Sequence, residues 1–169
     1  DDLLQRFLFD GCSLHAGQAC ILQSRLLLPE RIHDEVVERL VELARNVTVG
    51  DPTDPEVQMG PLISGTQRDR VEGHVAAAQT DGAKLVVGGR RPAHLERGFY
   101  LEPTVLLDVG KTDRCWEEEI FGPVVAITPF DDEAEMIRDV NASPYGLSGS
   151  LWTNDLRRAL RVAKAVESG

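Results

Sequence analysis

The chain has 169 residues, of which 42% are hydrophobic and 27% charged, an ordinary composition for a single globular domain with its own core. Its 28 acidic residues outnumber its 18 basic ones, and the formal net charge of −10 argues against nucleic acid as a partner, because lysine and arginine dominate phosphate binding. No apolar run approaches the length needed to cross a bilayer, so no membrane partner is expected.

The cysteines and the first residues of the chain bear on its cellular location and on whether it is part of a longer protein. Three cysteines at irregular spacing do not suit a disulfide framework, and we expect a reducing, cytoplasmic location. The chain opens with Asp1-Asp2 instead of a methionine, and no signal peptide is visible there. We therefore expect residues 1–169 to be one domain excised from a longer protein.

The first half of the chain is predicted to mix helices with a short strand. Residues 3–14 suit an amphipathic helix, and residues 26–28 form an apolar run typical of a strand. A helix should open at Pro29-Glu30 and end near Asn46, since proline is tolerated at a helix start. A Ser-x-x-Gln capping box predicts a further helix over residues 65–80.

Strands and helices are predicted to alternate in the second half. The strands are expected at residues 84–87, 101–107, 124–130 and 147–152. Asp131 should cap one helix, with apolar positions at Ala134, Ile137 and Val140, and Asn154 or Asp155 should begin the last, which should bury Leu156, Ala159, Leu160 and Ala163. Alternation of this kind predicts parallel pairing in an α/β layered domain.

A cysteine between a predicted helix and a predicted strand is the first candidate for chemistry. Cys20 ends Gly17-Gln18-Ala19-Cys20, and the small residues before it allow presentation to a cleft with little steric cover. A thiolate formed at neutral pH is a nucleophile, so Cys20 is a candidate catalytic residue. The alternative is a small buried apolar residue, which is what many free cysteines are.

An acidic stretch that runs into an aromatic residue and a turn is the second candidate. Glu119-Ile120-Phe121 is followed by Gly122-Pro123, which predicts a turn before the buried strand at 124–130. A carboxylate can accept from the vicinal hydroxyls of a ribose while a neighbouring ring packs on a flat heterocycle. The alternative, which the residues by themselves favour, is a solvated acidic helix end with a core phenylalanine.

Other chemistries have little support in the sequence. Cys12, His15 and Cys20 lack the spacing of a structural zinc site, and Cys115 is too distant to be an obvious fourth ligand, so no metal is expected. Cys12 and Cys115 are expected to pack in the core. Neither a Gly-x-Gly-x-x-Gly fingerprint nor a Gly-x-Ser-x-Gly elbow occurs.

Taken together, these stretches resemble the catalytic domain of the aldehyde dehydrogenase superfamily, over essentially the whole chain and in the family's order. Gly17-Gln18-Ala19-Cys20 is similar to the family's Gly-Gln-x-Cys, and residues 119–123 are similar to its Glu-x-Phe-Gly-Pro. Further similar segments are Ser24-Arg25, Gly50-Asp51-Pro52, Gly60-Pro61, Gly98-Phe99-Tyr100 with Pro103-Thr104, and Asn141 with Tyr145-Gly146-Leu147.

The resemblance implies a three-layer α/β/α domain with a mostly parallel central sheet, NAD or NADP as cofactor, and a small-molecule aldehyde as substrate. Cys20 would be the nucleophile, Glu119 would hold the nicotinamide ribose, and Phe121 would pack on the nicotinamide. Gln67 stands where several members have a glutamine near that ribose, and its capping-box role competes with this one. The parent protein is expected to be a homo-oligomer, a dimer or a tetramer.

The resemblance also implies what lies outside these residues. Members carry a Rossmann-type cofactor domain, a Glu-Leu-Gly-Gly segment with the general base, an oxyanion-binding asparagine and a C-terminal dimer segment. The isolated chain is therefore expected to be inactive. His15 and Gln23 depart from the residues of many members and bear on substrate preference. A CoA-acylating relative and a non-catalytic structural or binding protein that keeps the fold remain alternatives.

Overall fold

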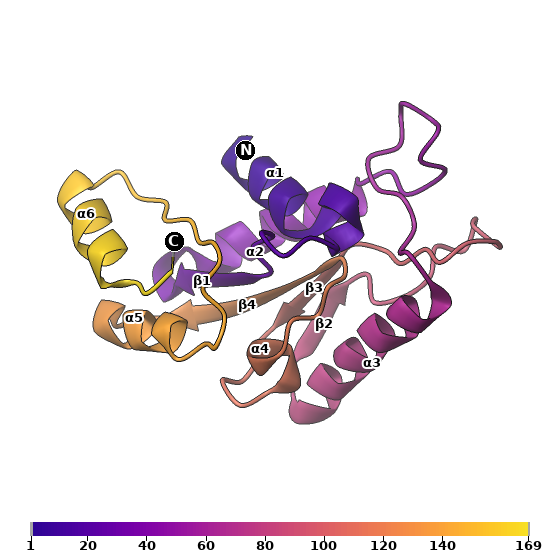
Figure 1. Ribbon diagram of the computed structural model, residues 1–169. Helices are drawn as coiled ribbons and strands as arrows, with labels where there is room; N and C mark the ends of the chain where they lie inside the picture. The colour runs from indigo at the N-terminus through magenta and orange to yellow at the C-terminus, as the bar shows by residue number, and fades with distance from the viewer. Residues whose placement is uncertain (1, 169) are drawn as a thin grey trace.

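A four-stranded sheet lies between two layers of helices in the computed structural model, which describes residues 2–168 (Figure 1). The strands lie in the order β1 (Arg25–Pro29), β4 (Val124–Phe130), β3 (Thr104–Leu107) and β2 (Lys84–Val87). Strand β4 pairs in parallel with both β1 and β3, whereas β2 runs antiparallel to β3. The predicted three-layer α/β/α fold with a mostly parallel sheet is confirmed.

Strand β4 is the centre of the core because its two faces enter different hydrophobic clusters. Val125 and Ile127 pack with α1 (Asp2–Leu8), α2 (Glu30–Arg45) and the π-helical turn η1 (Phe9–Ser13) on one face. Val124 and Ala126 pack on the opposite face. Burial on both sides is what a continuous apolar run in a parallel strand predicts, so the prediction for residues 124–130 is confirmed.

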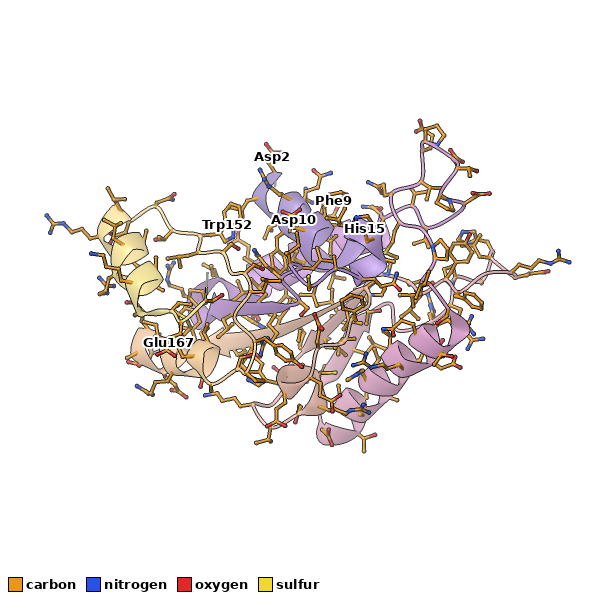
Figure 2. The ribbon with its side chains drawn as sticks, in the orientation of Figure 1. Asp2, Phe9, Asp10, His15, Trp152 and Glu167 are labelled. Atoms are coloured by element: carbon orange, nitrogen blue, oxygen red, sulfur yellow. The ribbon has the colours of Figure 1, made fainter. Side chains whose placement is uncertain are left out.

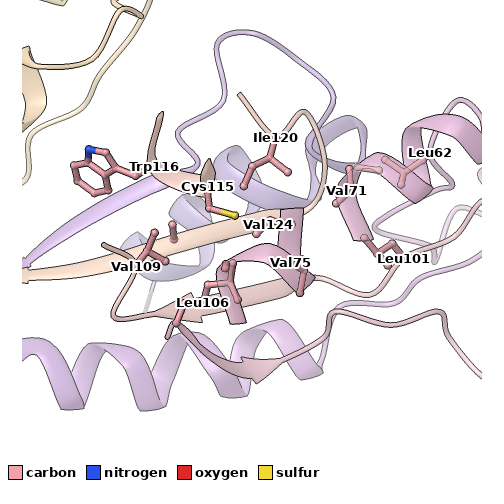
Figure 3. Close-up of a cluster of buried hydrophobic side chains, with 14 of the residues drawn as sticks. Leu62, Val71, Val75, Leu101, Leu106, Val109, Cys115, Trp116, Ile120 and Val124 are labelled. Atoms are coloured by element: carbon pink, nitrogen blue, oxygen red, sulfur yellow. The ribbon is translucent and has the colours of Figure 1, made fainter. Parts of the chain in front are cut away.

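Helices α3 (Gly65–Asp81) and α4 (Arg114–Glu117) cover the second face of the sheet (Figure 3). Val71 and Val75 of α3, Leu106 of β3 and Cys115 of α4 belong to one hydrophobic cluster. Helices α5 (Glu133–Asn141) and α6 (Leu156–Ala165) follow β4 and lie together at one end of the sheet (Figure 1). None of the described helices is long and apolar enough to span a membrane.

The first predicted helix is interrupted. Residues 3–14 do not form one α-helix: α1 ends at Leu8, η1 follows, and a short 3₁₀ segment, η2 (Leu14–Gly17), ends the run. Gly11 lies in the π-helical turn, where an added Cβ would be 2.7 Å from the Gln23 carbonyl oxygen. This close approach lets η1 pack against the segment that enters β1, which a helical apolar pattern does not indicate.

Two further boundaries differ from the prediction. Strand β3 begins at Thr104 instead of residue 101, since Pro103 lacks an N–H and the Thr104 hydroxyl donates to the Glu102 carbonyl at 2.8 Å. Helix α5 is capped by Asp132 instead of Asp131, and its carboxylate accepts from the Glu135 amide at 2.7 Å. Met136 is its buried residue, whereas Ala134 is exposed and Ile137 and Val140 are half-buried.

The predicted strand at residues 147–152 is wrong, and so is the predicted burial of α6. Residues 147–152 form a loop that side chains hold: Ser148 donates to the Ile21 carbonyl at 2.8 Å, and Trp152 donates to Ser150 at 2.8 Å. Leu156 and Leu160 of α6 are 73% and 55% exposed, Ala163 is exposed and Ala159 is half-buried, because no described segment covers that face. Asp155 does cap α6 as predicted.

Candidate functional site

The loop that carries Cys20 (residues 15–22) begins with three residues in the left-handed region. His15, Ala16 and Gly17 have φ values of 50°, 52° and 73°. Such angles cost free energy for residues with a Cβ, and they are found at sites where packing imposes them. A turn closed by the Leu22 amide on the Ala19 carbonyl at 3.2 Å follows, and it leaves Cys20 exposed. The segment therefore presents the thiol outward, as the sequence predicted.

The 15–22 loop packs backbone to backbone on the turn at residues 119–123. A Cβ added to Gly17 would lie 2.0 Å from the Gly122 carbonyl oxygen and 2.6 Å from the Pro123 nitrogen. Such distances leave no room for any side chain other than hydrogen. The two motifs, which lie about a hundred residues apart in the sequence, are thus joined at one position in the fold.

Gln18 joins the same loop to the segment before α3. Its side-chain oxygen accepts from the Ile63 amide at 3.0 Å, and its amide nitrogen donates to the His15 carbonyl at 3.0 Å. Figure 2 shows His15 on the outer surface, near Phe9 and Asp10 of the N-terminal helical segments. The two hydrogen bonds of Gln18 constrain the residues directly before Cys20. The sequence pattern did not indicate these two hydrogen bonds of Gln18.

Gln67 holds the 119–123 turn from α3. Its side-chain amide donates to the Phe121 carbonyl at 2.8 Å and more weakly to the Ile120 carbonyl at 3.4 Å. These bonds accompany a φ of 57° at Phe121, a strained value for an aromatic residue. The Ser64 hydroxyl accepts from the Gln67 amide at 3.1 Å, so the predicted cap forms, but the reciprocal half of the capping box does not.

Cys20 and Glu119 line one open groove of about 1450 Å³, which Tyr145 also lines. The Glu119 side chain is exposed, and its carboxylate has no hydrogen bond or ion pair with any described residue. A free carboxylate in a groove fits the vicinal hydroxyls of a ribose. Phe121 is half-buried. It lies two residues after Glu119 in the sequence but is not among the residues that line the groove. The cofactor roles predicted for Glu119, Phe121 and Gln67 stay predictions.

The other two cysteines are buried on opposite faces of the sheet. Burial raises the pKa of the Cys12 thiol to about 12 and the pKa of the Cys115 thiol to about 11. The Cys115 thiol donates to the His74 carbonyl at 3.2 Å. Both therefore pack in the core, as predicted. Among residues 2–168, no group of three or more His, Cys, Asp or Glu side chains is placed to hold a metal ion.

Arg25 is a further residue of this region whose role the sequence did not indicate. Its guanidinium donates to the Trp116 carbonyl and to the Ser143 hydroxyl, each at 2.9 Å, and lies 5.5 Å from the centre of the Trp116 ring. Burial lowers the pKa of this guanidinium from its ordinary value. It joins β1 to α4 and to the loop after α5. An arginine directly before the apolar run of a strand is the available sequence signal.

Comparison with known proteins gives a consistent result. A family model described as the aldehyde dehydrogenase family matches residues 2–169. Aminoaldehyde dehydrogenase 2 of Zea mays is 41% identical over 94% of this chain and 31% of its own length. An aldehyde dehydrogenase of Mycobacterium tuberculosis, solved as a complex with NAD⁺, shares 44% identity and a TM-score of 0.92 over 96% of this chain and 34% of its own. Betaine aldehyde dehydrogenase of Staphylococcus aureus, also solved with NAD⁺, has a TM-score of 0.95 and 35% identity over 100% of this chain and 34% of its own. The chain spans about a third of the length of these relatives.

Proposed function

The chain belongs to the aldehyde dehydrogenase family, and from that premise we propose that it is the catalytic domain of an NAD(P)-dependent aldehyde dehydrogenase. The parent protein would oxidise an aldehyde to a carboxylic acid. The observation that carries the proposal is the backbone contact between Gly17 and Gly122, which joins the loop of an exposed thiol to the turn of a free carboxylate.

In the proposed reaction, the Cys20 thiolate attacks the aldehyde carbonyl carbon and forms a thiohemiacetal. The backbone N–H of Cys20 would donate to the developing oxyanion, as preorganised donors do in acyl-transfer sites. When bound, the nicotinamide supplies the hydride acceptor. Loss of hydride from the thiohemiacetal carbon leaves a thioester on Cys20. Water then hydrolyses the thioester, releases the acid and restores the thiol, with a general base from outside residues 1–169.

The residues of this chain would contribute to cofactor binding as well. The Glu119 carboxylate would accept from the nicotinamide ribose hydroxyls, and Phe121 would pack on the nicotinamide ring. Gln67 supports this turn through the Phe121 carbonyl. The remainder of the cofactor site, including the residues that choose between NAD and NADP, would lie elsewhere in the parent protein.

The experiment is a steady-state assay of the full-length parent with NAD⁺ or NADP⁺ and a set of aldehydes. Aminoaldehydes and betaine aldehyde should be tested first, because relatives carry these substrates in their names. Cys20→Ala should abolish formation of the reduced cofactor, whereas Cys115→Ala, at a buried thiol, should retain activity. Full activity of Cys20→Ala would overturn the proposal.

Product analysis separates the hydrolytic reaction from its alternatives. A free acid as product supports hydrolysis, and a thioester formed when coenzyme A is added supports the CoA-acylating alternative. No cofactor reduction with any aldehyde would favour a non-catalytic protein that keeps the fold. The isolated 169-residue chain should be silent in the same assay. Robust NAD-dependent oxidation by the isolated chain would contradict the division of the site between segments.

The location and assembly of the parent protein stay predictions. A cytoplasmic location was expected from the cysteines, yet relatives from Pisum sativum and Atriplex hortensis carry peroxisomal and chloroplastic in their names. Fractionation of cells that express the full-length protein decides the location. Sedimentation of that protein decides between a dimer and a tetramer.

A further inference from the structure

The backbone of Glu119 is hydrogen-bonded on both sides by side chains from distant parts of the chain. The Tyr145 hydroxyl, from the loop after α5, accepts from the Glu119 amide at 3.3 Å. The Arg70 guanidinium, from α3, donates to the Glu119 carbonyl at 3.0 Å. Neither contact involves the Glu119 carboxylate. That carboxylate stays free in the groove that it shares with Cys20 and Tyr145.

These two bonds constrain the direction of the Glu119 side chain. The amide belongs to the peptide plane before its Cα, and the carbonyl belongs to the plane after it. Holding both planes restricts φ and ψ, and with them the direction of the Cα–Cβ bond. The side-chain torsions of Glu119 stay free, but a restricted Cα–Cβ direction keeps the carboxylate near the groove and lowers part of the entropy cost of binding a ligand.

Tyr145 is itself supported by a hydrogen-bonded series that leads back to the sheet. Its amide donates to the Ser143 hydroxyl at 3.2 Å, and that hydroxyl also accepts from Arg25 of β1 at 2.9 Å. Arg25 in turn donates to the carbonyl of Trp116, three residues before Glu119. The loop that carries Tyr145 and the segment that carries Glu119 are therefore both hydrogen-bonded to Arg25 of β1, through Ser143 and Trp116 respectively.

We propose that Tyr145 is a positioning residue for Glu119, and that its hydroxyl sets the affinity of the parent protein for the nicotinamide cofactor. The inference rests on the proposed function. Tyr145 does not contact the reacting atoms; it acts through the Glu119 amide. Arg70 is the matching positioning residue on the carbonyl side.

The test is Tyr145→Phe in the full-length protein, which removes the hydroxyl and keeps the ring. Loss of one hydrogen bond should raise the Kd for NAD⁺, or for NADP⁺ if that is the cofactor, by about three- to tenfold in calorimetry. Amide hydrogen exchange in a peptide that covers residues 117–121 should accelerate by a similar factor. The rate at which iodoacetamide alkylates Cys20 should not change, because the thiol lies on the other loop.

Tyr100→Phe is the matched control. Tyr100 is the other tyrosine of the chain, and its hydroxyl has no hydrogen bond with any described residue, so both measured quantities should equal those of the wild type. Arg70→Ala should reproduce the rise in Kd from the carbonyl side. Equal Kd values for wild type and Tyr145→Phe would overturn this inference and leave the proposed function standing. Failure of the wild type to bind either cofactor would overturn both.

Discussion

At the scale of single residues, burial separates one accessible thiol from two protected ones. Cys20 is exposed, whereas Cys12 and Cys115 are 0% and 2% exposed. Burial raises the pKa of the Cys12 thiol to about 12 and that of the Cys115 thiol to about 11, so both stay protonated at neutral pH. Reactivity toward electrophiles requires a thiolate that the reagent can reach.

Brief treatment of the folded protein with iodoacetamide should therefore label Cys20 faster than the other two by a factor on the order of a hundred, because the reagent reaches Cys20 and not the two buried thiols. Mass spectrometry of the peptides measures the three rates. Labelling in concentrated guanidinium is the control, and there the rates should converge. Comparable rates for Cys12 and Cys20 in the folded protein would contradict the assignment.

A second residue-scale prediction compares two glycines. Gly17→Ala places a Cβ against the Gly122 backbone at a φ of 73°, and should lower the free energy of unfolding by about 2–4 kcal/mol. Gly73→Ala is the matched control, since no atom lies within 4 Å of its Cβ position in α3. It should raise that free energy by about 0.5–1 kcal/mol, the helix-propensity gain. Urea denaturation measures both, and equal effects would contradict the backbone contact.

At the scale of elements, a buried histidine lies where α3 meets α4. The His74 ring is fully buried, and neither ring nitrogen has a hydrogen bond in the structure. Its Nε2 lies 3.8 Å from a Glu118 carboxylate oxygen, and the positive charges of Arg114 and Arg70 also act on the ring. Burial first, and then Arg114, lower the pKa of His74 from its ordinary value of 6.5. The packing of α3 and α4 thus favours the neutral ring.

The sign of the pH dependence follows from that lowered pKa. Below about pH 6.5 the unfolded chain binds a proton on His74 that the folded chain binds less readily, so the free energy of unfolding falls as the pH drops. Above that pH the contribution is constant. Urea midpoints at about pH 7.5 and pH 5.5 should show a smaller difference for His74→Gln than for wild type. His15→Asn, at an exposed ring, should keep the wild-type difference, and an unchanged slope in His74→Gln would refute the prediction.

At the scale of the whole molecule, large apolar side chains are exposed in the last part of the chain. Leu147, Leu151 and Trp152 of the loop before α6 are 55%, 41% and 50% exposed, and Leu156 and Leu160 of α6 are 73% and 55% exposed. Figure 2 shows Trp152 on that loop. Exposed apolar area of this kind favours association and dye binding.

The double variant Leu156→Ser/Leu160→Ser of the 169-residue chain should therefore bind a hydrophobic dye roughly twofold less and should self-associate less. Its free energy of unfolding should change by less than about 1 kcal/mol, because both side chains are more than half exposed. Ile63→Ser, at a side chain 81% exposed in the segment before α3, serves as the control. Dye fluorescence and sedimentation measure the outcome, and equal effects of the two changes would contradict the assignment of dye binding and association to α6.

The same scale shows what a sequence can and cannot predict here. The apolar run of β4, the amphipathic α2 and the Ser64 cap of α3 were predicted, because each depends on local periodicity or a local hydrogen bond. The π-helical turn and the loop at residues 147–152 were not predicted. The turn depends on the close approach of Gly11 to the Gln23 carbonyl, and the loop depends on hydrogen bonds of serine hydroxyls such as that of Ser148. For the candidate site, the motifs predicted Cys20 and Glu119, and their roles stay predictions. The side chains that donate to or accept from the backbone of the two motifs lie far along the chain, so the spacing of the motifs does not indicate them.

The contact of Gly17 with Gly122 has a consequence for recombining this protein with its relatives. A chimera with its breakpoint between residues 22 and 119 inherits the 15–22 loop from one parent and the 119–123 turn from the other. A parent that carries a larger residue at position 17 brings a Cβ into the backbone of the 119–123 turn, with which it must then be compatible. Crossovers that take both segments from one parent should yield folded chimeras more often. The 15–22 loop and the 119–123 turn should therefore be exchanged together.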